Sequence, residues 1–255
     1  NIIDILAIIA TVMGIATSIG LGIMQIGGGL NHLFDVPNNN FTKILITILM
    51  VAIFLGSSLT GLNHGVKWLS NLNILLGAIL LIFILIFGDL KFILESYTLA
   101  ISDYLQHFIE YSLRVNPYSG DDSWIQQWTV FYWAWVISWS PFIGGFVARV
   151  SRGRTIREFV VGVLIIPPLI SFTWIAGFGG TAIKLALNHN DKLVHIVDKD
   201  YTVALFELLS HFPLSEVTSS LAIVLIFIFI VTSADSTTHI VAGMATGGSI
   251  NPTLK

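Results

Sequence analysis

The sequence predicts an all-α integral membrane protein, and three observations lead to this fold class. Of the 255 residues, 55% are hydrophobic and only 11% are charged, whereas about 25% of the residues in soluble domains are charged. The mean hydropathy is +0.84. The apolar residues form long runs such as Ile74–Phe87, while a membrane β-barrel shows short alternating segments.

A membrane-spanning helix needs about 20 mostly apolar residues. Six windows meet this requirement: Ile5–Ile26, Phe41–Leu59, Leu69–Phe87, Trp128–Ala148, Phe159–Phe178 and Val217–Ala234. The one acidic or basic residue inside them is Lys43. It lies one turn from a window end, where its ammonium group can reach the membrane interface. The sequence therefore predicts six transmembrane helices.

Positive charge in a short connection marks the cytoplasmic side of a membrane protein. Four arginines lie between the fourth and fifth windows: Arg149, Arg152, Arg154 and Arg157. We therefore expect the loop Arg149–Arg157 to lie in the cytoplasm, in a multi-pass protein of the cell (plasma) membrane. Alternation of the helices then places residues 31–40, 88–127 and 179–216 outside. Apolar residues recur at helical spacing over 93–113, which predicts an amphipathic helix on the outer surface or against a neighbouring subunit.

Composition also excludes several classes of function. The formal net charge of −3 supplies no basic surface for nucleic acid. The absence of cysteine removes disulfides, thiolate catalysis and thiolate metal sites. An apolar window follows Asn1 almost at once, without the layout of a signal peptide. We expect one membrane domain over residues 1–255, incomplete at both ends.

The first window is rich in small residues: Gly14, Ala16, Thr17, Ser18, Gly20 and Gly22. A membrane helix of this kind packs closely against partner helices. We favour this interpretation over a direct role in binding a ligand.

The fourth window carries an aromatic stripe. Trp128, Tyr132, Trp135 and Trp139 are four, three and four residues apart, which places them on one face of a helix. Trp139 falls near the middle of the window, where an interfacial belt does not account for it. Aromatic ring faces attract a cation that has no hydrogen-bond donors by about 0.5–2 kcal/mol per ring. The stripe therefore indicates a site for such a cation, and plain helix packing is the alternative.

Prolines lie within the fourth and fifth windows, and two neighbouring hydroxyl residues lie near the end of the sixth. Pro141 and the pair Pro167–Pro168 remove backbone donors, so we expect both helices to be distorted there. Thr232 and Ser233 supply hydroxyl oxygens, with carbonyl oxygens one turn earlier, as a small cation requires. The alternative to a cation site is that these hydroxyls only bond the carbonyls of their own helix. Asp235 is expected near the end of the sixth helix.

Residues Trp128–Pro141 read WTVFYWAWVISWSP, and Ala148–Arg157 read ARVSRGRTIR. These two blocks resemble the betaine/choline/carnitine transporters. Three further stretches look like the same family, in the same order: Ala16–Gly22, Gly65–Asn71 and Val231–Ser236. The resemblance implies twelve helices, ten of them in two inverted five-helix repeats of the LeuT-like type. This chain would supply helices five to ten, with the first repeat ending within 1–90 and the second beginning within 124–255.

The same resemblance implies a function and a set of site residues. We expect a secondary active transporter of a quaternary-ammonium solute such as glycine betaine, choline or carnitine. It would work by cation-coupled alternating access in a homotrimer that the 93–113 helix helps to hold together. Trp135 and Trp139 match aromatic residues along the solute pathway, and Tyr132 belongs to the same stripe. One half of a sodium site matches Phe229, Thr232 and Ser233, and a second sodium site matches Thr11 and Phe142. No other cofactor is expected.

Two residues depart from the family pattern. Val136 stands where the family usually has a second adjacent tryptophan that forms a wall of the ammonium cage. A valine has no ring, which removes about 1–2 kcal/mol of cation–π attraction, so transport of a non-quaternary solute by the same fold is the alternative. Ile15 is apolar where some sodium-coupled members carry a hydroxyl, which weakens the match to the second sodium site.

Two other classes of function are less consistent with the sequence. Rings of like charge inside the windows would indicate a passive channel, and the sequence shows none. An intramembrane hydrolase that uses Ser57 with His64 or His239 would need a nucleophile elbow and a positioned carboxylate, and the sequence shows neither.

Overall fold

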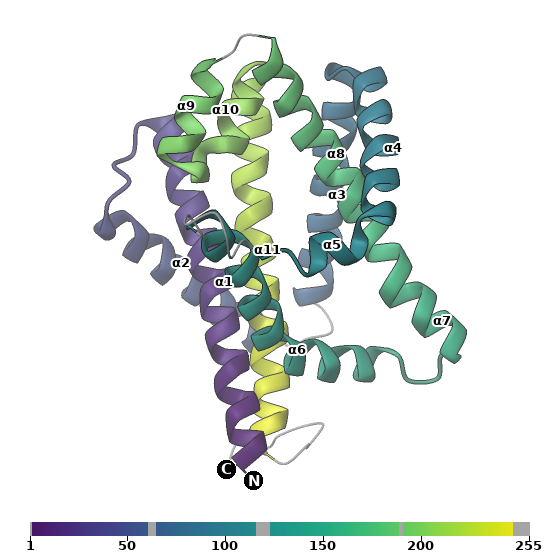
Figure 1. Cartoon of the computed structure of the whole chain (residues 1–255). Coiled ribbons are helices and arrows are strands. Elements are labelled where there is room, and N and C mark those ends of the chain that lie inside the picture. The colour runs from purple at the N-terminus through teal and green to yellow at the C-terminus, as the bar shows by residue number, and fades with distance from the viewer. Residues whose placement is uncertain (1, 61–64, 116–122, 189–190, 247–255) are drawn as a thin grey trace. The chain divides into compact units, whose positions relative to one another are not determined.

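The computed structural model describes residues 2–60, 65–115, 123–188 and 191–246, and these residues form helices and connections without any strand (Figure 1). The chain divides into two compact units. Unit 1 comprises residues 1–19, 100–159 and 236–255, and unit 2 comprises residues 20–99 and 160–235.

The helices follow one another along the chain as Figure 1 labels them. In order they are α1 (Ile2–Phe34), α2 (Asn40–Thr60), α3 (Gly65–Phe87), α4 (Leu90–Gln106), α5 (Phe108–Ser112), η1 (Ile125–Val130), α6 (Phe131–Val150), α7 (Ile156–Val160), η2 (Val161–Ile165), α8 (Ile166–Leu187), α9 (Asp191–Lys199), η3 (Tyr201–Val203), α10 (Ala204–Ser210) and α11 (Ser215–Ala245).

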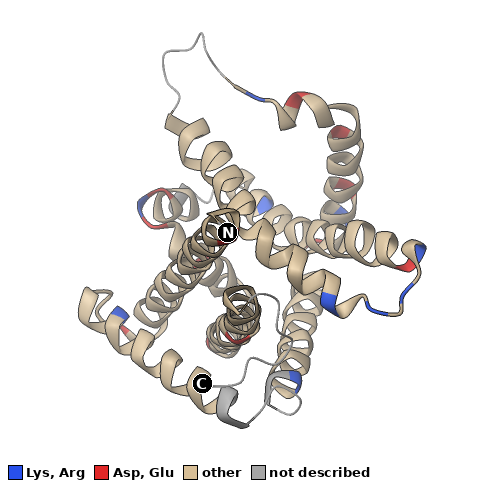
Figure 2. Ribbon diagram, turned by 90° about the horizontal axis from the view of Figure 1, so that it is seen from below, with Lys and Arg blue, Asp and Glu red and all other residues tan. Residues whose placement is uncertain are grey.

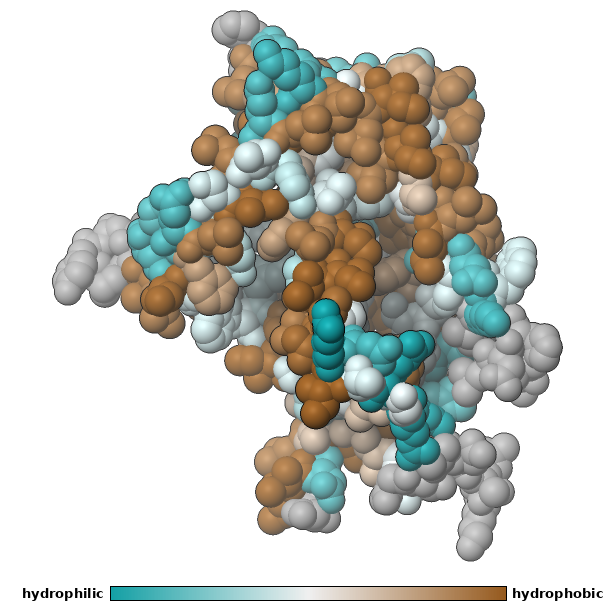
Figure 3. Space-filling view, turned by 90° about the vertical axis from the view of Figure 1, so that its right-hand side faces the viewer, coloured by the Kyte–Doolittle hydropathy of each residue, from teal (hydrophilic) through white to brown (hydrophobic). Residues whose placement is uncertain are grey.

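Within the described residues, five helices are long and apolar enough to cross a membrane: Ile2–Phe34, Lys67–Phe87, Ile125–Val150, Ile156–Leu187 and Ser215–Ala245. The remaining expected helix is α2, which has 21 residues and is apolar over Asn40–Gly56. Apolar side chains cover much of the face drawn in Figure 3, and hydrophilic side chains gather in separate patches. The predicted class of an all-α membrane protein is confirmed.

The first helix is longer than its apolar window. Ile5–Ile26 was the expected span, but α1 has 33 residues and continues to Phe34. It ends where Asp35 takes a φ of 52°, the left-handed conformation that commonly follows the end of a helix. The next helix begins after Asn39, whose Oδ1 accepts a hydrogen bond from the amide of Thr42 at 2.9 Å, as an N-cap residue does.

Proline changes the helical pattern of the fifth expected span. In place of one helix over Phe159–Phe178, the chain forms α7, then the π-helical segment η2, then α8. The π turn directly precedes Pro167 and Pro168, which lack the amide donors that an α-helical turn needs. The predicted distortion is therefore confirmed here. Pro141, in contrast, lies within the single helix α6.

The expected amphipathic helix over 93–113 is broken in two. Helices α4 and α5 meet at His107, which has a φ of −110° and a ψ of 18°. The carboxylate of Asp103 lies 3.1 Å from His107 Nδ1 and accepts a hydrogen bond from the Tyr111 hydroxyl at 2.8 Å, which raises the pKa of Tyr111 above its usual 10.0. Large apolar side chains on both helices, Leu99 and Ile109 among them, are exposed.

Unit 2 has a continuous apolar core. Its buried side chains come from α3, α8, α10 and α11: Leu80, Ile84, Phe178, Phe206, Leu208, Leu209 and Ala222. Helices α3 and α8 lie side by side (Figure 1). Helix α1 reaches this core through Gly29, where an added Cβ would lie 2.4 Å from Phe206 Cζ.

Unit 1 has a smaller core that α1, α6 and α11 form together. Ile15, Phe142 and Ile240 are buried in it, and Ile19, Trp139 and Met244 pack against them. This core holds the middle of α1, at Ile15 and Ile19, against α6, the helix that carries the aromatic stripe.

Candidate functional site: an aromatic face on α6

The predicted aromatic stripe forms along η1 and α6. The rings of Trp128 and Tyr132 stack with centroids 6.2 Å apart, and the centroids of Tyr132 and Trp135 are 5.6 Å apart. Phe131 joins the group, with its centroid 5.9 Å from both Tyr132 and Trp135. Phe131 was not among the predicted residues, because it lies one position away from the stripe.

Trp135 is directed at α1. Its indole Nε1 donates hydrogen bonds to the carbonyl oxygen of Gly14 at 3.1 Å and to the hydroxyl oxygen of Ser18 at 3.0 Å. The close approach depends on Gly14, since an added Cβ there would lie 2.6 Å from Ser138 Oγ and 3.2 Å from Trp139 Cδ1. Close packing by the small residues of α1 is therefore confirmed at Gly14. It is not seen at Gly20, where an added Cβ would meet no atom within 4 Å.

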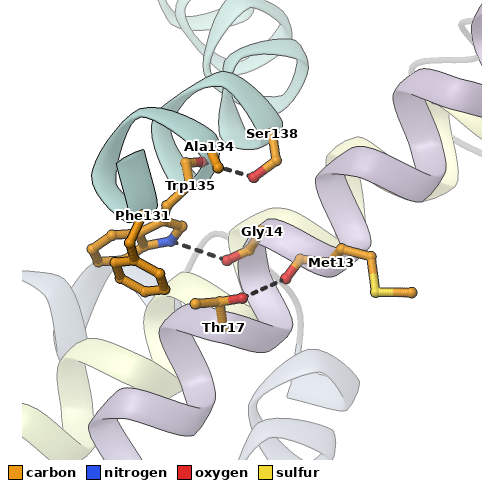
Figure 4. Close-up of a pocket in the computed structure, with 7 residues that line it drawn as sticks. All are labelled: Met13, Gly14, Thr17, Phe131, Ala134, Trp135 and Ser138. Carbon is orange, nitrogen blue, oxygen red and sulfur yellow. Dashed lines mark hydrogen bonds between the residues drawn. The ribbon is translucent and has the colours of Figure 1, made fainter. Parts of the chain in front are cut away.

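A cavity of about 160 Å³ lies between α1 and α6 beside Trp135 (Figure 4). Its walls are Met13, Gly14, Thr17, Phe131, Ala134, Trp135 and Ser138. The hydroxyl groups among them are engaged: Thr17 donates to the carbonyl of Met13 at 3.0 Å, and Ser138 donates to that of Trp135 at 2.8 Å. The remaining wall is aromatic and aliphatic, which suits a cationic group that donates no hydrogen bonds.

The other predicted solute residues lie apart from this cavity. Tyr132 and Val136 are 47% and 61% exposed, and neither is among the residues that line it. Trp139 packs on Phe142 with ring centroids 5.4 Å apart. Its indole Nε1 is buried and has no hydrogen-bond partner. The structure thus brings Trp135 and Phe131 together around the cavity and distributes Tyr132, Val136 and Trp139 around other parts of α6.

The residues of the expected sodium half-site share one turn of α11. Thr232 is 8% exposed, and its hydroxyl donates to the carbonyl oxygens of Ile228 at 2.9 Å and Phe229 at 3.0 Å. The carbonyl oxygen of Phe229 and the hydroxyl oxygen of Thr232 therefore lie together, with Ser233 next in the chain. Hard oxygen ligands of this kind suit a small cation. The hydroxyl of Thr232 also makes the intrahelical bonds that the alternative interpretation predicts.

The residues matched to a second sodium site lie in unit 1. The side chain of Thr11 is fully buried, and its Oγ1 has no hydrogen-bond partner. A buried hydroxyl without a partner costs about 1–3 kcal/mol. One turn further along α1, Ile15 packs against Phe142 and supplies no second hydroxyl.

Other chemistries find less support. Across the part of the chain that the structure describes, no group of three or more His, Cys, Asp or Glu residues could hold a metal ion. The side chain of Ser57 and all of His64 lie outside the described part. Asp235 was expected near a helix end, and this was wrong: it is 1% exposed, because α11 continues to Ala245.

Comparison with known proteins identifies the family. The model of the betaine/carnitine/choline family transporters matches residues 1–255. The chain is 50% identical over 252 residues to an ectoine/hydroxyectoine transporter of Virgibacillus pantothenticus, covering 99% of this chain and 50% of that protein. It is 44% identical over 251 residues to a glycine betaine transporter of Bacillus subtilis, covering 98% and 48%. A glycine betaine/proline/choline transporter of Vibrio parahaemolyticus is 41% identical over 252 residues, covering 98% and 45%. The chain spans about half the length of these relatives, and it belongs to the betaine/carnitine/choline transporter family.

Proposed function

We propose that the full-length protein is a secondary active transporter that accumulates a compatible solute by cation-coupled alternating access. The family match over all 255 residues carries this proposal. The aromatic cavity between α1 and α6 agrees with it, because ring faces attract positively charged solutes. The LeuT-like inverted repeat, the homotrimer and the cytoplasmic position of the loop Arg149–Arg157 belong to the same proposal.

The solute is proposed to carry a positively charged head group. A quaternary ammonium such as glycine betaine is the first candidate, supported by the names of two relatives and by the rings of Phe131 and Trp135. Ectoine is the second candidate, supported by the name of the 50% identical relative and by Val136. The head group of ectoine is a flat amidinium with N–H donors, so it depends less on a complete cage of rings than a trimethylammonium group does.

The driving cation is proposed to be sodium, bound in part by Phe229, Thr232 and Ser233. The neighbouring oxygens of Phe229 and Thr232 support this assignment. A second sodium at Thr11 and Phe142 is a weaker proposal. The unpartnered hydroxyl of Thr11 favours it, and the apolar side chain of Ile15 beside Phe142 does not.

Uptake by the full-length protein in proteoliposomes tests the proposal. Labelled glycine betaine and labelled ectoine are each offered with and without an inward sodium gradient, and with an inward proton gradient of equal size. We expect accumulation of at least one solute above its external concentration, only when a cation gradient is present. Flux that equilibrates without regard to any gradient would indicate a channel. If folded protein takes up neither solute under any gradient, the proposal is wrong.

A further inference from the structure

We infer that Ser18 is a positioning residue: together with the carbonyl of Gly14, it fixes the orientation of the Trp135 indole at the edge of the α1–α6 cavity. The inference rests on the proposed function insofar as Trp135 acts on the transported solute. Ser18 is also one of the small residues that allow α1 to pack closely against other helices.

The three groups form a closed set of hydrogen bonds. The indole N–H of Trp135 is shared between Ser18 Oγ at 3.0 Å and the Gly14 carbonyl oxygen at 3.1 Å. The hydroxyl of Ser18 donates to the same Gly14 carbonyl at 3.2 Å. Because its proton is used in this way, the lone pairs of the hydroxyl are free to accept from the indole. The hydroxyl therefore serves Trp135 as an acceptor with a defined direction.

Packing alone does not fix this ring. Within α6, Trp135 contacts Phe131 and Tyr132, one turn earlier, at centroid distances of 5.9 and 5.6 Å. On another side the indole lines the cavity of about 160 Å³ rather than packing against protein atoms. The two hydrogen bonds to α1 are the interactions that hold the indole in place as a cavity wall (Figure 4).

This arrangement predicts how loss of the Ser18 hydroxyl affects transport. Ser18→Ala removes one acceptor and leaves the Gly14 carbonyl, so the indole gains freedom to turn while the helix remains intact. A ring that turns away from its position weakens solute binding more than it slows turnover. We expect the KM for the solute to rise about threefold to tenfold, the range for one lost neutral hydrogen bond, with Vmax within about twofold of the original.

A spectroscopic measurement tests the contact without depending on transport. The full-length protein is labelled with indole-15N tryptophan, and the signal of Trp135 is assigned by its loss in Trp135→Phe. We expect Ser18→Ala to shift this signal and to speed exchange of its proton with solvent. The matched control is Ser140→Ala on α6, which removes a hydroxyl that donates to the carbonyl of Val136 at 2.9 Å; it should leave the signal in place. An unchanged Trp135 signal in Ser18→Ala would overturn the inference.

A double-mutant cycle connects the contact to the solute. In the Trp135→Phe background a smaller aromatic ring replaces the indole and the N–H donor is absent, so Ser18→Ala should change KM no further. If Ser18→Ala raises KM equally in both backgrounds, Ser18 acts through general packing and the inference is wrong. If no solute is transported by the unmodified protein, the proposed function fails, and the spectroscopic result still decides whether Ser18 positions Trp135.

Discussion

At Gly29, helix α1 leaves no room for a side chain. An added Cβ would lie 2.4, 2.7 and 2.9 Å from three atoms of the Phe206 ring, and Phe206 is 1% exposed, so the ring cannot move away without disturbing the core of unit 2. Overpacking of this kind costs about 1–3 kcal/mol. We therefore expect Gly29→Ala to lower the thermal unfolding temperature of the detergent-solubilised full-length protein.

Gly20 provides the control for this substitution on the same helix. No atom lies within 4 Å of its added Cβ, and alanine is a better helix former than glycine, so Gly20→Ala should leave the unfolding temperature unchanged or raise it slightly. If both variants lower the unfolding temperature equally, the contact with Phe206 is not the reason why residue 29 has no side chain.

The hydroxyls of α11 make a second prediction at this scale. If Thr232 and Ser233 bind the coupling cation, replacing both with Ala removes two oxygen ligands, and an interaction with a charged group contributes about 1.5–3 kcal/mol. The sodium concentration for half-maximal uptake should then rise about tenfold or more. Thr218→Ala is the matched control, since this buried hydroxyl on the same helix donates to the carbonyls of Leu214 and Ser215, each at 3.2 Å. If the double variant keeps the original sodium dependence, sodium does not bind at this turn of α11.

At the scale of elements, apolar length and residue spacing predicted the six helices and the stripe on α6, because both follow from the local chemistry of the chain. The π turns of η1 and η2 were not predicted, since periodicity does not distinguish a π turn from an α turn. The hydrogen-bond partner of Trp135 could not be predicted from the sequence either. Ser18 is 117 residues away along the chain, and a single sequence contains no signal for a contact at that separation.

Asp89 joins two helices of unit 2 in two different ways. Its Oδ1 accepts a hydrogen bond from the amide of Phe92 at 3.0 Å, which caps α4, and its Oδ2 pairs with Lys184 on α8. A lost cap costs about 1 kcal/mol, and a partly exposed ion pair contributes about 0–1 kcal/mol. Because Asp89→Ala removes both the cap and the ion pair, we expect it to lower the unfolding temperature more than a variant that removes the ion pair alone.

Two further variants separate the cap from the ion pair. Asp89→Asn keeps an oxygen for the cap and loses the charge, and Lys184→Met keeps the cap and the aliphatic stem, so each should lower the unfolding temperature less than Asp89→Ala. Combining them should add little to either alone, because both remove the same pair. If Asp89→Asn is as unstable as Asp89→Ala, the cap of α4 contributes nothing.

At the scale of the whole molecule, the distribution of arginine predicts an orientation in the membrane. Arg149, Arg152, Arg154 and Arg157 follow one another along the end of α6, the connection and α7, where Figure 2 shows them as a run of blue segments. Short connections rich in arginine remain in the cytoplasm. Helix α5 lies in the connection between the third and fourth expected spans, so it should face the opposite side of the membrane from the arginines.

The absence of cysteine from the 255 residues allows a direct measurement of this orientation. Arg152→Cys and Glu110→Cys are introduced singly into the full-length protein, with any cysteines in its remaining part replaced, and intact cells are treated with a membrane-impermeant maleimide. Residue 110 is exposed on α5 and residue 152 is exposed in the connection after α6, so both thiols are accessible to the reagent on their own side. We expect residue 110 to be labelled in intact cells and residue 152 only after the membrane is permeabilised. The reverse pattern would place the arginines outside and invert every helix of the chain.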